Sequence, residues 1–342
     1  MSNPTPPRIL LVRFSSIGDL LLTTPLLRVL RRRYPDADLT FVTRADMADT
    51  LRDNPHLTRL VTWPREGSLR ALARDLRQTP WTHRLDLHGS LRSRALRLLV
   101  GGRWHGYSKH RVRRQLLVTT HGRLGGRIAP VADRYFDAAS ALDVLPDGAP
   151  AEYFVTDIAA GQATRFLADH HLASGRPLLA LAPGAAHFTK RWPTDHWLAL
   201  AARMAATHDI VVLGGPAERE VAVRIVAAAG PRAASAAGTV SLSGTAALLQ
   251  RATAVVVGDT GILHLATAVG TPVVGLYGPT VEAFGFFPYH AHAVAVQHPL
   301  ACRPCSSRGG AACPLGHHHC LVQILPAEVT DALASLTATN PA

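Results

Sequence analysis

Three short loops carry residue types that can do chemistry, and each follows an apolar run of strand length. The first loop, Ser15 to Asp19, places a carboxylate at the expected start of a helix. Such a carboxylate can cap the helix and offset its dipole, or it can act as a general base that takes a proton from a substrate hydroxyl. The spacing of the loop leaves both interpretations open.

The second loop runs from Ala182 to Pro193 and combines Gly184 with the adjacent Thr189 and Lys190. Glycine permits a tight backbone, Thr189 offers a hydroxyl, and Lys190 or Arg191 could neutralise a phosphate. The alternative is a surface loop with solvated charges. Of the 36 basic residues, 34 are arginine, a bias typical of a GC-rich genome, so a lysine retained against that bias is notable.

The third loop covers Val257 to His264, where an apolar run ends, a glycine-containing turn follows and a helix is expected to begin. The backbone N–H groups of Thr260 and Gly261 would then be available to bind an anion such as a diphosphate. Asp259 precedes them, and the histidine lies one turn into the helix. A histidine on an apolar helix can equally be structural.

One further carboxylate, Glu218, follows the apolar run that ends at Leu213. A carboxylate in this position can accept hydrogen bonds from both hydroxyls of a ribose, or it can be an ordinary acidic residue in the first turn of a helix. The spacing alone does not separate these two interpretations.

The loops lie between apolar runs and helically spaced segments that alternate along the chain, which is typical of parallel sheets covered by helices. In the first half, the pattern predicts strands at Arg8–Phe14, Asp38–Thr43, Arg59–Trp63 and His83–Leu87, and helices at Leu20–Arg33, Arg44–Asp53 and Ser68–Arg77. In the second half, it predicts strands at 178–182, 209–213, 254–257 and 272–277, and helices at 158–171, 194–207, 217–229, 245–251 and 262–269.

A stretch rich in Pro and Gly at residues 144–157 interrupts this alternation and is interpreted as a linker. The sequence therefore predicts two α/β domains, residues 1–150 and 151–342, with a last helix that could return to pack on the first domain. Ligands of such sheets bind at the carboxyl ends of the strands, where all of the loops above fall.

The net charge of +12 is confined to the first half, because residues 1–150 hold 25 basic and 13 acidic residues whereas residues 151–342 hold 11 of each. A basic half suggests an anionic partner. A nucleic-acid-binding protein is a remote alternative, since aromatic residues make up only 6% and no DNA- or RNA-binding motif is present. No nucleic-acid partner is therefore expected.

Several common protein classes lack their signature in this sequence. No apolar stretch reaches the roughly 18 residues of a membrane-spanning helix. The N-terminus MSNPTPPRILLVRF has no signal-peptide pattern, so a cytoplasmic protein is expected. The glycine motifs of dinucleotide dehydrogenases and P-loop NTPases and the G-x-S-x-G elbow of hydrolases are missing as well.

Five segments occur in an order that resembles a known family: RILLVRFSSIGDLLLTTPLL, DLHGSLRSRAL, LAPGAAHFTKRWP, LGGPAERE and GDTGILHLATAVGTPVVGLYGPT. Together they resemble the lipopolysaccharide heptosyltransferases of glycosyltransferase family 9. The resemblance implies the GT-B class of α/β fold, in which two Rossmann-like domains with parallel sheets face a central cleft. The first domain would bind the acceptor and the second the ADP-sugar.

The resemblance also implies an activity, the inverting and metal-independent transfer of heptose from ADP-heptose to the inner core of lipopolysaccharide. The acceptor would be Kdo-lipid A or heptosyl-Kdo-lipid A, and no cofactor would be required for catalysis. Asp19 would be the catalytic base. The implied donor-binding residues are Thr189, Lys190, Glu218, Asp259, Thr260, Gly261 and His264.

The acceptor is expected to contact the first loop and nearby arginine clusters, namely Ser15, Ser16, Gly18, Arg92, Arg111, Arg113 and Arg114. These arginines would attract the phosphates and carboxylates of lipid A-Kdo at the anionic cytoplasmic face of the inner membrane, where a peripheral monomer is expected. Solvated arginine faces are the alternative. A family 9 enzyme with another acceptor, an O-antigen sugar or a protein, is the alternative function.

Four cysteines fall close together as C-x2-C-x7-C-x6-C, at Cys302, Cys305, Cys313 and Cys320. In a cytoplasmic protein this is not a standard disulfide framework. A structural zinc or iron site is chemically reasonable, and reduced or partly paired structural cysteines are the alternative. Similar Cys-rich tails in family members that add the second heptose slightly favour that step, and a related branch holds iron with cysteines at a different spacing.

Overall fold

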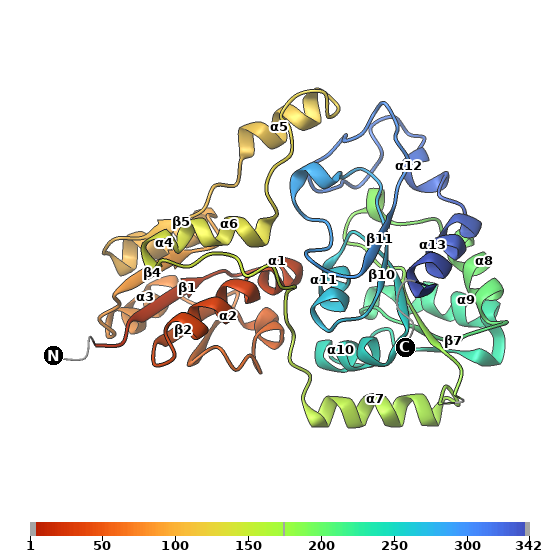
Figure 1. The fold of residues 1–342 in the computed structure, drawn as a ribbon, viewed down its shortest axis with the longest axis horizontal. Helices are drawn as coiled ribbons and strands as arrows, with labels where there is room; N and C mark the ends of the chain where they lie inside the picture. The colour runs from red at the N-terminus through yellow and green to blue at the C-terminus, as the bar shows by residue number, and fades with distance from the viewer. Residues whose placement is uncertain (1–4, 174, 339–342) are drawn as a thin grey trace. The chain divides into compact units, whose positions relative to one another are not determined.

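The computed structural model describes residues 5–173 and 175–338, and the chain divides into two compact units. The first unit contains the chain up to Lys109 together with Ala129–Phe154, and the second contains His110–Ile128 and the chain from Val155 onward. Each unit is built on a sheet of parallel strands with helices packed against it (Figure 1). The expected α/β class with two parallel sheets is confirmed.

The sheet of the first unit gathers the early strands in a non-sequential order. Its strands are β1 (Arg8–Val12), β2 (Asp38–Arg44), β3 (Arg59–Trp63), β4 (His83–Asp86) and β5 (His105–Gly106). Their order across the sheet is β3-β2-β1-β4-β5, so β1 is flanked by β2 and β4. The order reverses between β1 and β4, and at such a switch point the loops after the two strands diverge and leave room for a ligand.

Helices cover this first sheet by burying its apolar side chains. α3 (Leu69–Arg77) and α4 (Leu91–Val100) pack together, and their leucines meet Leu10 and Val12 of β1 in one buried cluster. Each such fully buried leucine stabilises the fold by about 1.5–3 kcal/mol. The remaining helical elements of this unit are α1 (Ile17–Leu21), α2 (Thr24–Arg33), η1 (Ala45–Thr50), α6 (Val131–Ala138) and η2 (Ser140–Leu142).

The single helix expected over Leu20–Arg33 is divided into α1 and α2 by a proline. Pro25 has no N–H to donate to the carbonyl of Leu21, four residues earlier, and its ring disfavours a continuous helix there. The Thr24 hydroxyl donates to that carbonyl instead, at 2.7 Å. The helix expected at 44–53 is likewise only the 3-10 element η1, because the aspartates in this segment favour turns over regular helix.

The sheet of the second unit repeats the pattern. Its strands are β6 (Leu178–Ala182), β7 (Asp209–Val212), β8 (Ala233–Ser235), β9 (Ala254–Gly258), β10 (Val273–Leu276) and β11 (Ala293–Val296). They lie in the order β11-β10-β9-β6-β7-β8, and the paired strands are parallel. The switch point of this sheet is therefore between β6 and β9, the strands that precede the second and third chemical loops.

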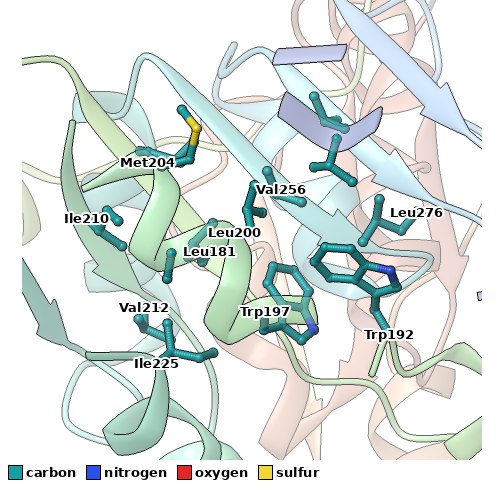
Figure 2. Close-up of a cluster of buried hydrophobic side chains, with 14 of the residues drawn as sticks. Leu181, Trp192, Trp197, Leu200, Met204, Ile210, Val212, Ile225, Val256 and Leu276 are labelled. Carbon is teal, nitrogen blue, oxygen red and sulfur yellow. The ribbon is translucent and has the colours of Figure 1, made fainter. Parts of the chain in front are cut away.

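The helices of the second unit cover both faces of its sheet. They are α5 (Arg111–Thr119), α7 (Asp157–Asp169), α8 (Thr194–Met204), α9 (Arg219–Ala229), α10 (Leu242–Arg251), α11 (Gly261–Ala268), α12 (His319–Val322) and α13 (Pro326–Ala338), with 3-10 turns η3 (Phe188–Lys190), η4 (Pro216–Glu218), η5 (Gly230–Arg232) and η6 (Glu282–Phe284). α8, α9 and α13 lie together in Figure 1. In Figure 2, Trp192 and Trp197 lie beside Val256 and Leu276 of the sheet.

The last helix, α13, packs on the core of its own unit. Val329, Leu333 and Leu336 belong to the same buried cluster as Trp192, whose indole N–H donates to the Ile324 carbonyl at 2.9 Å. These contacts bury the apolar face of α13 in the second unit.

The segment 110–128 also differs from the expected division, because it groups with the second unit. Leu117 and Ile128 form a buried cluster with Phe284, and the N–H of Ile128 donates to the Ala283 carbonyl at 3.0 Å. The linker itself falls where it was expected, since the second crossing between the units lies at Phe154 and Val155.

This grouping changes the distribution of charge. The segment 110–128 brings five arginines and no acidic residue to the second unit, while Glu152 falls in the first, so each unit has a net charge of +6. The sequence asymmetry is therefore a property of the chain halves and not of the folded units. Within residues 5–173 and 175–338, no helix has the length and hydropathy needed to span a membrane.

Candidate functional site

Asp19 lies at the switch point of the first sheet, in the first turn of α1, the helix that follows β1. Its carboxylate accepts from the Ser16 hydroxyl at 2.8 Å and from the Ser16 N–H at 3.3 Å, which orders the start of α1. The other carboxylate oxygen lies 2.8 Å from a guanidinium nitrogen of Arg13. The helix-capping and ion-pairing roles are thus combined in one side chain that keeps 22% of its surface exposed.

Arg13 is a partner that the sequence pattern does not single out, because it lies in the apolar run Arg8–Phe14 that predicts a strand. Its guanidinium is buried, donates to the Leu87 carbonyl and the Tyr107 hydroxyl, and lies 5.5 Å from the ring centre of Tyr135. A buried charge requires a charged partner. A charged residue inside an otherwise apolar strand was the available signal.

The electrostatics of Asp19 follow from this pairing. Burial by itself raises the pKa of Asp19, but the charge of Arg13 and the hydrogen bonds from Ser16 outweigh burial and hold the pKa below its usual value. Asp19 is therefore ionised at neutral pH and able to accept a proton. The pKa of Asp19, and with it the strength of Asp19 as a base, depends on its ion pair with Arg13.

His88 lies next to this pair and was also missed by the sequence reading. Its Nδ1 accepts from the Phe14 N–H at 3.0 Å, which ties the end of β4 to the end of β1. Burial, followed by the charges of Arg13 and Lys109, lowers the pKa of His88 to about 4. The imidazole is consequently neutral, with its proton on Nε2.

The other residues predicted at this site of the first unit are placed as follows. Ser16 is exposed, Ser15 is half-buried and Gly18 is buried at the start of α1. The guanidinium of Arg92 lies 5.9 Å from the ring centre of Trp63, so its stem is held against an aromatic surface. Asp19, Ser15 and Ser16 therefore share one loop, whereas Arg92 lies on α4.

Lys190 and Asp259 meet at the switch point of the second sheet, one from the loop after β6 and the other from the end of β9. The Lys190 ammonium lies 2.7 Å from a carboxylate oxygen of Asp259 and donates to the Asp259 carbonyl at 3.2 Å. The same carboxylate oxygen accepts from the Thr280 hydroxyl at 2.7 Å. The lysine is thus held in place and its charge is balanced.

The N-terminus of α11 adjoins this pair. Thr260 is its N-cap, and no described residue hydrogen-bonds to the buried Oγ1 of Thr260. Gly261 begins the helix, and His264 is buried one turn later. The Tyr277 hydroxyl is likewise buried with no partner among residues 5–173 and 175–338. A lysine, polar atoms with unused hydrogen-bonding capacity and backbone N–H groups at a helix start together suit an anion.

Glu218 fits into a space that two glycines leave open. A Cβ on Gly184 would lie 2.6 Å from the Glu218 carboxyl carbon, and a Cβ on Gly214 would lie 2.7 Å from its Cβ. Glu218 accepts from the Gly215 N–H at 2.8 Å, so its carboxylate is fixed beside the loop after β6. The structure therefore brings Glu218 to the loop that carries Lys190.

Comparisons with known proteins identify the family of this chain. The sequence model of glycosyltransferase family 9 (heptosyltransferase) matches residues 69–315. The chain belongs to glycosyltransferase family 9. Lipopolysaccharide heptosyltransferase 1 of Pseudomonas aeruginosa is 31% identical to this family 9 enzyme, over 87% of this chain and 86% of its own length.

Two further similarities cover nearly the whole of this family 9 glycosyltransferase. Lipopolysaccharide heptosyltransferase 2 of Salmonella typhimurium is 25% identical over 96% of this chain and 98% of its own. The structure of E. coli ADP-heptose LPS heptosyltransferase II has a TM-score of 0.73 and 24% identity, covering 97% of this chain and 99% of that one. This match confirms the expected GT-B class.

The arginines of segment 110–128 differ in their contacts and in their exposure in this family 9 enzyme. Arg114 donates to the Ser307 carbonyl at 2.8 Å and lies 5.4 Å and 5.3 Å from the ring centres of Phe284 and Phe286. It therefore holds α5 on the second unit. Arg113 donates to the carbonyls of Gly125 and Arg127 but is exposed, and Arg111 is exposed at the start of α5.

The cysteines of the family 9 enzyme are all free thiols. Burial raises the pKa of Cys320 to about 11, Arg303 opposes this rise, and Cys305, Cys302 and Cys313 add to it. The thiols therefore lie within electrostatic reach of one another. Among the described residues no group of three or more His, Cys, Asp or Glu side chains is arranged to hold a metal ion.

Proposed function

We propose that this family 9 glycosyltransferase moves heptose from ADP-heptose to the inner core of lipopolysaccharide, with inversion at the anomeric carbon. The observation that carries the proposal is the Lys190–Asp259 pair at the start of α11, beside the unused Thr260 hydroxyl. The names of the relatives supply the sugar and the acceptor class, and the structural relative's name supplies ADP-heptose as the donor.

The second unit would hold the donor. Lys190 would exchange its contact with Asp259 for the diphosphate, whose charge grows as the glycosidic bond breaks. The N–H groups at Thr260 and Gly261 would bind the same anion, and Glu218 would accept from the hydroxyls of the ribose. A lysine and backbone dipoles can offset the leaving-group charge in this way without a divalent metal.

The first unit would supply the base. The acceptor hydroxyl attacks the anomeric carbon while the bond from that carbon to the diphosphate oxygen breaks, so ADP departs with the electron pair. Asp19 would receive the hydroxyl proton. Arg13 would remain beside the carboxylate, and neutral His88 would offer an N–H donor in the same loop cluster.

The acceptor proposal rests on exposed positive charge. Arg92 and Arg111 would attract the phosphates and carboxylates of lipid A-Kdo, and we propose that the enzyme works as a monomer at the cytoplasmic face of the inner membrane. Arg113 would also attract the acceptor. Arg114 would not, because its guanidinium already contacts the Ser307 carbonyl and the Phe284 ring.

Release of ADP from ADP-heptose tests the activity directly. The assay should compare Kdo-lipid A, heptosyl-Kdo-lipid A, an O-antigen oligosaccharide and an unmodified autotransporter domain as acceptors, each with and without EDTA. We expect transfer to one of the two inner-core acceptors, undiminished by EDTA. Transfer only to the oligosaccharide or the protein would contradict the acceptor and favour the alternative family 9 function, and loss with EDTA would contradict metal independence.

A further inference from the structure

The Cys-rich segment, residues 302–320, is not used by the function proposed above, yet it packs on the loop that carries Lys190. The Gly310 N–H donates to the Thr189 hydroxyl at 2.8 Å, and the Thr189 N–H donates back to the Gly310 carbonyl at 3.2 Å. Thr189 immediately precedes Lys190 and is buried. The backbone around the lysine is therefore fixed from this segment.

His318 completes the hold on Thr189. Its Nε2 lies 3.1 Å from the Thr189 carbonyl oxygen, and because a carbonyl only accepts, Nε2 is the donor. The imidazole also packs on the Phe188 ring with 5.0 Å between ring centres, and only 8% of the residue is exposed. The N–H, the carbonyl and the hydroxyl of Thr189 are thus all bonded to the Cys-rich segment.

Gly309 allows the segment to come close to the lysine itself. A Cβ at this position would lie 3.2 Å from Cγ of Lys190, 3.2 Å from Oγ1 of Thr189 and 3.0 Å from Cβ of His187. Its φ of +92° is also one that other residues rarely adopt. Close approach and backbone conformation both require glycine here, which is what a tight contact between two loops needs.

The Cys-rich segment is anchored in the hydrophobic core of the second unit. Directly after His318, Cys320 and Leu321 of α12 enter the main buried cluster of the second unit. A Cβ on Gly278 would lie 2.9 Å from both Cγ of Leu321 and the Thr189 carbonyl oxygen, so the loop is confined on this side as well. Because the core is closely packed, a segment anchored in it can keep the neighbouring loop, and with it Lys190, in one orientation.

We propose that the Cys-rich segment is a positioning element for Lys190, acting through the hydrogen bonds of His318 and Gly310 to Thr189. The inference rests on the proposed function, because it assigns this segment to the binding of the ADP diphosphate. Lys190 is a flexible side chain with four rotatable bonds. Because the backbone that carries it is already ordered, less conformational entropy of this loop is lost when the ammonium binds an anion.

The test measures the Kd of ADP by calorimetry, with the melting temperature as a check on folding. His318→Ala should raise the Kd about 3- to 10-fold, the worth of one hydrogen bond. His318→Gln, whose amide nitrogen can replace Nε2, should recover most of the loss. His319→Ala is the matched control, because this exposed side chain stacks only on His317, and it should leave the Kd unchanged.

A double-mutant comparison separates positioning from general stability. In a Lys190→Ala background, His318→Ala should have no further effect on the Kd, because the group it positions is gone. An equal loss in both backgrounds, or no loss in the single variant, would overturn the inference. If His318→Ala does not fold, Gly309→Ala applies the same test by pushing on Lys190 directly. Absence of ADP binding by the unchanged protein would instead overturn the proposed function, and with it the inference.

Discussion

The carboxylate of Asp19 lies 2.8 Å from the guanidinium of Arg13, in a loop where burial and the ion pair act on its pKa in opposite directions. The pair means that the proposed base is held in its charged form by the residue that directly follows β1. Any change to Arg13 should therefore be visible in the pH dependence of the reaction.

Arg13→Gln should move the acidic limb of the transfer-rate profile to higher pH. Removing the cation takes away the interaction that lowers the pKa of Asp19, so the carboxylate protonates at a higher pH and stops acting as a base there. Transfer rates measured from pH 4 to 8 check this. A limb at the same pH in both proteins would mean that Asp19 is not the titrating base.

Asp19→Asn should lower the transfer rate by about 10²–10⁴-fold, the usual worth of a general base, while the ADP Kd stays within about twofold. The amide keeps the shape of the side chain and can still accept a hydrogen bond from Ser16, but the buried Arg13 loses its charged partner, so the melting temperature is measured as a check on folding. Single-turnover kinetics and calorimetry measure the two quantities. Unreduced turnover would remove Asp19 from the catalytic role.

Lys190→Ala should weaken ADP binding about 10-fold or more, because a charge-assisted hydrogen bond contributes about 1.5–3 kcal/mol. The matched control is Lys109→Ala, at the second of the two lysines in the sequence, which lies in the first unit. Lys109→Ala should leave the ADP Kd unchanged. Equal effects of the two substitutions would point to overall charge instead of a placed group.

Gly184→Ala should raise the donor KM and lower stability by about 1–3 kcal/mol, because the new Cβ would overlap the Glu218 carboxyl group. The penalty should largely vanish in a Glu218→Ala background, where the obstructing side chain is absent. Gly161→Ala is the control, since open space surrounds this helical position and the change should stabilise α7 by about 0.5–1 kcal/mol. A persistent penalty in the double variant would contradict the packing of Glu218 against Gly184.

How much the sequence could predict is clear from these sites. The apolar runs predicted that Lys190, Glu218 and Asp259 lie at the carboxyl edge of one sheet and Asp19 at that of the other, because residues that follow parallel strands lie at the same edge of their sheet. Arg13 and His88 were missed because their importance arises from tertiary pairing. A charge inside a strand shows its role only when the partner across the loop is known.

The placement of α5 shows a second limit. Sequence order assigned residues 110–128 to the first domain, but the contacts of Arg114 with Ser307 and two phenylalanines attach the segment to the second unit. Those partners lie more than 160 residues away in the chain. No local sequence pattern reveals contacts between residues so far apart. Because the segment carries its arginines to the second unit, the charge difference between the chain halves is absent from the folded units.

His88 gives a prediction about stability instead of catalysis. Its pKa is lowered to about 4 in the folded protein, against about 6.5 in an unfolded chain, so below pH 6.5 the unfolded chain binds a proton that the folded protein does not. The contribution of neutral His88 to the free energy of unfolding should therefore be fully present above pH 6.5. It should decrease as the pH drops toward 4, by up to about 3 kcal/mol in total. Urea unfolding at a series of pH values measures this.

His88→Gln removes the titrating group while its side-chain oxygen can still accept from the Phe14 N–H. This variant should lose stability less steeply between pH 6.5 and 4 than the unchanged protein, and the difference between the two curves should be small above pH 7. The pH range distinguishes His88 from Asp19, because the lowered pKa of Asp19 also causes a loss of stability on acidification, but only at more acidic pH. Parallel curves for the two proteins across this range would show that His88 is not buried in its neutral form.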